Sequence, residues 1–245
     1  MKNGKIYFYL LVTYILMHVS SIFLSKGLFL YFPWSEEFTD KDMAYRASSW
    51  TLFTVNSIAA IIFLLLIVPK KNFFQVFKGK KSTIPNSIQW GFIGFFLALG
   101  GQMLAGAIEN AIGITPGSDN TAILSDIAKV SPIIIVCMVL FAPFLEEIIF
   151  RRVIFGGVYQ KTNFWIAAIV SAIVFAAVHN EFEHLLMYMM PAFVFAYLYY
   201  RTKRILTPMI AHLLMNGFVV ILNLNIEKIQ QWQEEMKPVI IFFLN

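Results

Sequence analysis

Charged residues are scarce in this sequence. Only 13% of the residues are Asp, Glu, Lys or Arg, whereas 59% are hydrophobic. A soluble domain carries roughly 25% charged residues, so the composition excludes an ordinary soluble domain and predicts a protein embedded in the lipid bilayer. The net charge of +5 comes from Lys and Arg between apolar stretches. No nucleic-acid-binding motif accompanies this charge, so we expect no nucleic acid among the partners.

Cysteine, repeats and soluble segments are also lacking. The single cysteine, Cys137, excludes an internal disulfide. No internal repeat or low-complexity tract divides the chain, which predicts one integral membrane domain over residues 1–245. The first apolar stretch, Ile6–Ser25, is longer than the roughly 7–15 residues of a cleavable signal sequence. We therefore expect it to be retained as an anchor.

Seven apolar stretches are long enough, or nearly so, to cross a hydrocarbon layer of about 30 Å as helices. The sequence thus predicts an all-α, multi-pass membrane bundle of about seven to eight transmembrane helices. Near the C-terminus, apolar residues recur at near-helical spacing among polar ones, which predicts a surface helix. Pro238–Asn245 is apolar but too short to cross. The seven stretches are Ile6–Ser25, Trp50–Pro69, Ser87–Ile108, Ser131–Phe150, Asn163–Val178, Leu185–Tyr200 and Ile205–Leu224.

Lys and Arg are distributed unevenly between these stretches. Thirteen of the 19 lie in the N-terminal tail and in the second, fourth and sixth connections. Cytoplasmic loops of membrane proteins are enriched in both residues. The pattern predicts a multi-pass protein of the cell membrane with a cytoplasmic N-terminus.

Two carboxylates interrupt the fourth stretch. Glu146 and Glu147 lie in FAPFLEEIIFRR, whereas almost all other acidic residues lie in loops or tails. A charged side chain at the centre of a membrane helix costs about 2.5–3.5 kcal/mol, so such residues usually face a water-filled cavity. Arg151 lies one turn after Glu147 and can neutralise it, which leaves Glu146 freer. Alternatively, both glutamates are solvated at the cytoplasmic edge beside Arg151 and Arg152.

Two further pairs occur in later apolar stretches. Phe175 and His179 are four residues apart in VFAAVHN, and His212 and Asn216 are four apart in IAHLLMN. Each pair therefore shares one face of a helix. A lone histidine in an apolar helix is more often a packed core residue, but here two occur, each with polar company.

A helical hairpin could bring these groups together. If the chain turns near Lys161–Asn163, Glu146 lies about 23 Å before the turn and His179 about 26 Å after it. His212 joins them if the hairpin extends roughly 11–14 Å beyond the membrane edge. Glu181, Glu183 and His184 follow His179 and are expected in a solvated outer loop. Alternatively, the fifth helix breaks there and its polar end lines a cavity.

The motifs Glu-Glu-x-x-x-Arg, Phe-x-x-x-His and His-x-x-x-Asn, in this order, resemble those of the CAAX-protease and bacteriocin-processing family of intramembrane glutamic endopeptidases. They lie within residues 131–224, the expected catalytic core. The resemblance implies a helical fold with a cytoplasm-facing cavity, where Glu146 is the general base for water and His179 its partner. The resemblance also implies that the substrates are prenylated proteins or small secreted peptides such as bacteriocin or signalling precursors. We expect no cofactor.

The same resemblance assigns the remaining motif residues. His212 and Asn216 would stabilise the tetrahedral oxyanion, and Glu147, Arg151 and Phe175 would support the site. Independently of the resemblance, hydrolysis of an amide needs a base, oxyanion donors and an acid for the leaving amine, and these side chains can supply all three. Cys137 is half a turn out of phase with Glu146 in an ideal helix and is expected to pack.

Three other functions remain compatible with the residues. Two histidines and a glutamate can form a zinc peptidase site, although the helix signature H-E-x-x-H is absent. Intramembrane Glu and His also occur in proton-coupled transporters, which often contain repeated halves. The third is a non-catalytic membrane protein that binds a peptide or confers immunity to it.

Overall fold

The computed structural model describes residues 4–244, with side chains for residues 4–237. This part of the chain is helical and contains no strand, which confirms the all-α, multi-pass bundle. The α-helices are α1 (Gly4–Tyr31), α2 (Asp40–Ile67), α3 (Ile84–Ala111), α4 (Asp119–Val130), α5 (Ile134–Val136), α6 (Ala142–Glu146), α7 (Gly156–Tyr159), α8 (Phe164–Ala177), α9 (Leu185–Thr202), α10 (Leu206–Leu224) and α11 (Ile226–Leu244). Two π-helical segments, η1 (Cys137–Phe141) and η2 (Glu147–Phe155), and one 3₁₀ turn, η3 (Phe182–His184), complete the described elements.

Four of the described helices, α1, α2, α3 and α10, are long and apolar enough to cross a membrane. The apolar helix α8 is shorter, with 14 residues. The predicted span Ser131–Phe150 is instead divided among short α- and π-helical segments, and α9 contains Pro191. These two regions are lined by other helices, so they belong to the interior of the bundle and need not present a continuous apolar surface to lipid.

Helical structure also occurs in two segments where the apolar pattern did not predict it. Helix α2 begins ten residues before the predicted span because Thr39 and Asp42 form a capping box. Helix α4 occupies a segment in which no helix was predicted, and Ser118 caps its N-terminus. It buries Ile127 and Ala128 against the bundle, so it is held by tertiary packing.

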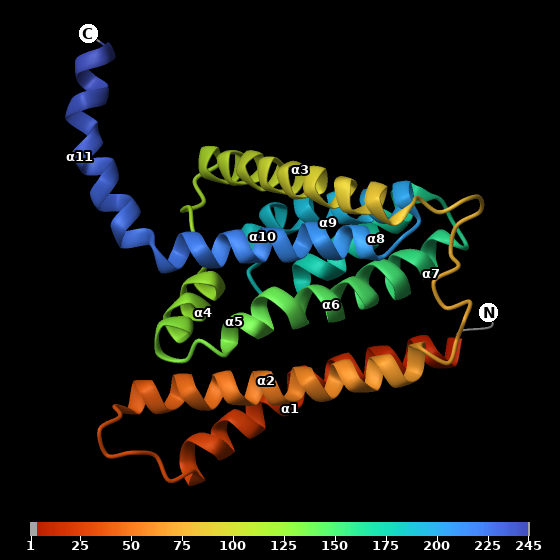
Figure 1. Cartoon of the computed structure of the whole chain (residues 1–245), viewed down its shortest axis with the longest axis horizontal. Helices are drawn as coiled ribbons and strands as arrows, with labels where there is room; N and C mark the ends of the chain where they lie inside the picture. The colour runs from red at the N-terminus through yellow and green to blue at the C-terminus, as the bar shows by residue number, and fades with distance from the viewer. Residues whose placement is uncertain (1–3, 245) are drawn as a thin grey trace.

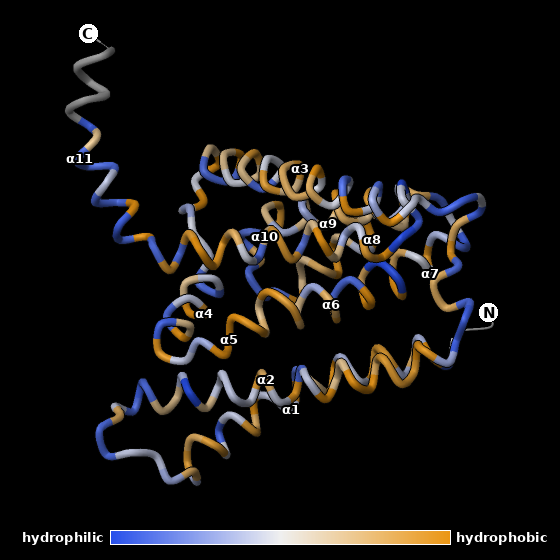
Figure 2. Tube along the Cα trace, in the orientation of Figure 1, coloured by the Kyte–Doolittle hydropathy of each residue, from blue (hydrophilic) through white to orange (hydrophobic). Residues whose placement is uncertain are grey.

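The helices form two groups on either side of residues 134–159 (Figure 1). Helices α1 and α2 pack against each other on one side, and α3, α8, α9 and α10 pack together on the other. The long helices carry apolar residues along their length, while polar residues gather at the two ends of the bundle (Figure 2). Large apolar side chains such as Phe23, Leu65 and Phe96 are exposed on the outer surface, as a lipid environment requires.

Helix α11 leaves the bundle after Asn225 and runs across the direction of α10 (Figure 1). Its Trp232 side chain is 61% exposed. The predicted C-terminal helix is therefore confirmed, and it continues through the apolar segment to Leu244. Its place on the membrane surface stays a prediction, and Asn245 lies outside the described residues.

Candidate active site

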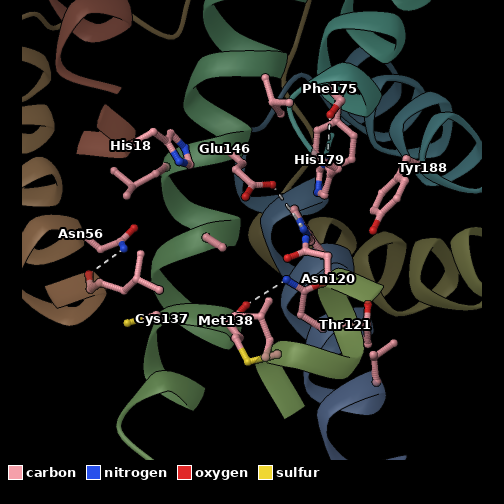
Figure 3. Close-up of a pocket in the computed structure, with 18 of the residues that line it drawn as sticks. His18, Asn56, Asn120, Thr121, Cys137, Met138, Glu146, Phe175, His179 and Tyr188 are labelled. Carbon is pink, nitrogen blue, oxygen red and sulfur yellow. Dashed lines mark hydrogen bonds and ion pairs between the residues drawn. The ribbon is translucent and has the colours of Figure 1, made fainter. Parts of the chain in front are cut away.

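The three sequence motifs meet in one place. Glu146 ends α6, and its Oε2 lies 3.8 Å from Nε2 of His212 on α10. His179 lies just beyond the end of α8 and faces the Glu146 carboxylate across a cavity (Figure 3). The chain is helical up to Tyr159 and turns before α8, so the predicted hairpin is present. Three segments that are distant in sequence thus place a carboxylate and two imidazoles around one space.

Glu147 links His212 to Arg151 in the buried part of the site. Its Oε1 lies 2.9 Å from Nδ1 of His212, and its Oε2 lies 3.2 Å from Nε of Arg151. Glu147 and Arg151 are both 0% exposed, and the Arg151 guanidinium lies over the rings of Phe175 and Phe195. The predicted Glu147–Arg151 pair is confirmed, and it orients His212 from the side opposite Glu146.

The change from α- to π-helix falls between the two glutamates. Glu146 closes α6 and Glu147 opens η2, a kind of irregularity that is frequent at functional sites. Arg152 is also buried, and it donates hydrogen bonds to the Phe73 carbonyl and the Tyr7 hydroxyl. The alternative in which these residues are solvated at the membrane edge is therefore wrong.

Glu146 is the carboxylate left free to act in the cavity. Its side chain is 16% exposed, and its Oε2 accepts no hydrogen bond from the described residues. Glu147, by contrast, has a close partner at each oxygen, His212 at Oε1 and Arg151 at Oε2, although its Oε2 likewise accepts no hydrogen bond from the described residues. The difference agrees with the prediction that Glu146 is the freer of the two.

Hydrogen bonding fixes the proton position on His179. Its Nδ1 lies 2.8 Å from the Phe175 carbonyl oxygen, which can only accept, so Nδ1 carries the hydrogen. In the neutral ring, Nε2 then presents a lone pair. The ring stacks on Tyr188 with centroids 4.1 Å apart and contacts the Phe175 ring at 4.8 Å. Phe175 therefore supports His179 through both its carbonyl and its ring.

Asn216 lies one turn beyond His212 on the cavity wall. Its Nδ2 donates a hydrogen bond to the Met138 carbonyl at 2.8 Å, which ties α10 to the π-helical segment η1. An amide nitrogen has two hydrogens, so one remains for a group in the cavity.

The cavity has a volume of about 340 Å³ and lies between the α1–α2 pair and the rest of the bundle. Its wall combines apolar side chains with polar groups from several helices, many of them drawn in Figure 3. A space of this size accommodates water and a short stretch of peptide. Within the described residues, no group of three or more His, Cys, Asp and Glu side chains is arranged to hold a metal ion.

His18 on α1 is a wall residue that motif reasoning missed. It is exposed toward the cavity, and its ring contacts Tyr14 with centroids 4.7 Å apart. Asn56 on α2 and Asn120 on α4 add polar groups to the same wall. An ionisable residue inside the first apolar stretch was the available signal, since such residues usually mark functional sites.

The loop after His179 was expected to be solvated, but two of its three polar residues are bound to other helices. Glu181 accepts hydrogen bonds from the backbone N–H of Asn120 at 2.6 Å and from the Tyr188 hydroxyl at 2.8 Å. His184 pairs with the buried Glu109 at 3.0 Å. Only Glu183 is exposed as predicted. Glu181 therefore contacts α4 and His184 contacts α3. No local sequence pattern predicts these contacts.

Cys137 packs with Ile127, Ala128 and Ile134, as expected. It also contributes to the cavity wall, although in Figure 3 its sulfur points away from the Glu146 carboxylate. The intervening π-helical turns alter the ideal helical phase on which the expectation rested. Its burial makes it a packing residue.

Comparisons with known proteins agree with this geometry. Residues 128–218 match the family model of the type II CAAX prenyl endopeptidase Rce1-like proteins. The chain is 40% identical over 235 residues to YdiL of Bacillus subtilis (strain 168), whose name assigns it to the membrane peptidases; the match covers 94% of this chain and 93% of YdiL.

A second relative is the membrane-embedded CAAX protease MroQ of Staphylococcus aureus (strain USA300). It is 36% identical over 202 residues, which cover 79% of this chain and 80% of MroQ. No solved structure was found to match. The extent of these similarities shows that the chain belongs to the Rce1-like family of CAAX prenyl endopeptidases, which are membrane proteases.

Proposed function

We propose that this membrane protease is an endopeptidase of the glutamic type, in which Glu146 and His179 activate a water molecule. The observation that carries the proposal is the 3.8 Å approach of His212 Nε2 to the Glu146 carboxylate in a cavity that His179 also lines. A base, a second proton acceptor and a hydrogen-bond donor then surround one position, as amide hydrolysis requires.

The first step is attack by water. Glu146 accepts a proton from water while the His179 Nε2 lone pair orients the same molecule, and the oxygen attacks the peptide carbonyl. The developing oxyanion accepts hydrogen bonds from His212 Nε2–H and from the free hydrogen of Asn216. Protonated Glu146 then returns its proton to the leaving amine, so that the C–N bond breaks and the carboxylate is regenerated.

Charge balance supports a protonated His212 as the donor. Glu146 and Glu147 carry two negative charges within reach of His212, and Arg151 supplies one positive charge. A proton on His212 makes this buried group neutral, and buried charges are tolerated when they are paired. The Glu147 carboxylate fixes the hydrogen on Nδ1, which leaves Nε2–H directed toward the reacting group.

The remaining features of the proposal concern the surroundings. The substrate is a peptide or a protein segment held at the lipid bilayer, and the chain lies in the cell membrane with its N-terminus in the cytoplasm, as the Lys and Arg distribution predicts. We further propose that the reaction needs no metal or other cofactor. Cleavage by protein that has been treated with a chelator and shown by elemental analysis to be metal-free supports this part, and loss of cleavage restored only by zinc contradicts it.

Glu146→Gln tests the proposed base. In protein reconstituted in lipid, we expect kcat/KM for candidate peptides to fall by about 10²- to 10⁴-fold, because general-base catalysis contributes this much. The thermal midpoint should change little, since Oε2 makes no hydrogen bond within the described residues. The products are read by mass spectrometry.

Glu183→Gln is the matched control, because Glu183 is an exposed carboxylate outside the cavity. It should cleave at the wild-type rate. Identical fragments from wild type and Glu146→Gln would show that this site is not the hydrolytic centre. A peptide that binds equally to both proteins and is cut by neither would favour the non-catalytic binding protein.

A further inference from the structure

The two ends of the bundle carry opposite charge. At one end, called the basic end, the start of α1, the last turn of α9 and the α2–α3, α7–α8 and α9–α10 connections hold ten Lys and Arg residues and no Asp or Glu. At the other, the acidic end, the last two turns of α1, the α1–α2 connection, the first two turns of α2, the end of α3, α4, the α8–α9 connection and α11 hold twelve acidic residues and only six Lys and Arg residues. Figure 1 shows the basic end at the right and the acidic end at the left.

Burial of Arg151 and Arg152 leaves this asymmetry intact. Both had been counted as loop residues in predicting the orientation, yet both are buried within η2. Of the eleven others, Lys2 lies outside the described residues, and the remaining ten are Lys5, Lys70, Lys71, Lys78, Lys80, Lys81, Lys161, Arg201, Lys203 and Arg204. Enrichment of Lys and Arg in short loops marks the cytoplasmic side of a membrane protein, so the basic end is the cytoplasmic one.

The cavity lies in the half of the bundle near the acidic end. Helix α8 contributes its last turn and His179, and α4 contributes Asn120 and Thr121 from its first turn. Helix α1 contributes residues from Tyr14 to Ser21, which lie well beyond its basic N-terminal turn. Each contribution comes from the part of its helix that is remote from the basic end.

Toward the basic end, the interior is closed. A layer of fully buried side chains fills the space between the cavity and the Lys- and Arg-rich connections. It contains the Arg151 guanidinium packed over Phe175 and Phe195, and Arg152 over Tyr7 and Phe73. Its other members include Phe150, Phe155 and Tyr199, each at most 1% exposed.

On the remaining sides, the wall is less complete. His18 on α1 is exposed, and Val178 at the end of α8 is 47% exposed, although both line the cavity. Asn120 and Thr121 are partly exposed at the acidic end. Water and peptide can therefore reach Glu146 from the acidic end and the adjoining membrane, but not through the packed layer.

We propose that the catalytic cavity opens on the non-cytoplasmic face of the membrane, so that its substrates are exported peptides or the external segments of membrane proteins. This assignment differs from the cytoplasm-facing cavity that the family resemblance implied. It also favours secreted peptides over prenylated proteins as substrates. A prenylated C-terminal motif lies in the cytoplasm, whereas a secreted peptide reaches the other side of the membrane. The statement about substrate rests on the proposed function, whereas the statement about access does not.

Cysteine accessibility tests the direction of access without any need for activity. The lone cysteine, Cys137, is buried, so Cys137→Ser provides a cysteine-free background. Ser21→Cys and Thr121→Cys place single thiols in the cavity wall. Ser35→Cys marks the α1–α2 connection at the acidic end, and Asn72→Cys marks the α2–α3 connection at the basic end. Each protein is treated with a charged, membrane-impermeant maleimide in intact spheroplasts and in inverted vesicles.

We expect both cavity thiols and Ser35→Cys to react in spheroplasts, and Asn72→Cys to react only in inverted vesicles. Full reaction of every variant after denaturation shows that each thiol is competent. Cavity thiols that react only in inverted vesicles, or from neither side, overturn the proposal, as does Asn72→Cys reacting in spheroplasts. Because the readout is labelling, an inactive Glu146→Gln protein gives the same pattern, so failure of the access proposal is distinct from failure of the peptidase proposal.

Discussion

The packed half near the basic end and the open half near the acidic end use ionisable residues in opposite ways. In the packed half, Glu147, Arg151 and Arg152 are fully buried and paired or stacked on aromatic rings. In the open half, Glu146 and His179 each keep an atom free toward the cavity. Reacting groups need to be held in place while remaining available. In the proposed mechanism, the residues that react and the residues that hold them in place lie in different halves.

His212 joins the two halves. Its Nδ1 belongs to the packed half through Glu147, and its Nε2 belongs to the open half through Glu146. Its ring stacks on Phe195 with centroids 4.9 Å apart. The packed half therefore sets the direction in which His212 presents its second nitrogen, and substitutions in that half should affect both stability and cleavage.

Arg151→Met should have the largest effect on stability. It leaves Glu146 and Glu147 with His212 as their shared cationic partner, and breaking a buried ion pair in this way costs about 3–5 kcal/mol. The loss is measured as a fall in thermal midpoint in detergent or lipid, and cleavage should fall with it. The double variant Glu147→Gln, Arg151→Met removes both charges and should recover part of the stability. A double variant no more stable than the single one would contradict the ion-pair argument.

Gly91→Ala should have an intermediate effect. A Cβ at position 91 of α3 would lie 2.8 Å from Cβ of Ile210 on α10, closer than two such atoms pack. Overpacking of this kind costs about 1–3 kcal/mol. Gly100→Ala in the same helix is the control, because a Cβ there meets nothing within 4 Å. If both variants unfold at the same temperature, the close contact between α3 and α10 does not hold.

The smallest effect concerns Glu181 in the open half. Burial raises the pKa of Glu181, but hydrogen bonds outweigh it and hold this pKa below its ordinary value. The donors are the backbone N–H of Asn120 and the hydroxyls of Tyr188 and Ser118. A carboxyl with a lowered folded-state pKa stabilises the protein above its unfolded pKa of about 4.3, and this contribution is lost as pH falls through the folded value.

The test compares the thermal midpoints of wild type and Glu181→Gln between neutral and acidic pH. The wild type should be more stable at neutral pH, and the difference should shrink as the pH falls below about 4. A difference that is constant with pH would mean that the charge of Glu181 does not anchor α4.

Spacing within single helices made the central part of the site predictable. Glu147 and Arg151 are one turn apart and pair as expected, and the hairpin geometry correctly placed Glu146 and His179 at one level. Such predictions succeed because a helix fixes the relative positions of residues three or four apart. The roles of these residues in catalysis stay a prediction.

Contacts between helices were not predictable in the same way. His18 lies in a helix without a motif, and Glu181 and His184 find their partners on α4 and α3. Hydropathy also gave no signal that the predicted span Ser131–Phe150 is divided among short α- and π-helical segments in the interior of the bundle. Apolar composition alone does not distinguish a surface that meets lipid from one that meets protein.

The contacts of Arg152 determine whether the motif-bearing part of the chain can fold without the N-terminal helices. The family model matches only residues 128–218, yet the guanidinium of Arg152 donates its hydrogen bonds to the Tyr7 hydroxyl and the Phe73 carbonyl. In a fragment limited to residues 128–218, the Arg152 guanidinium would lose both hydrogen-bond acceptors while it remained in an apolar environment. The N-terminal third, which contains no motif, thus stabilises the part that bears the motifs. Residues 128–218 expressed alone should not fold.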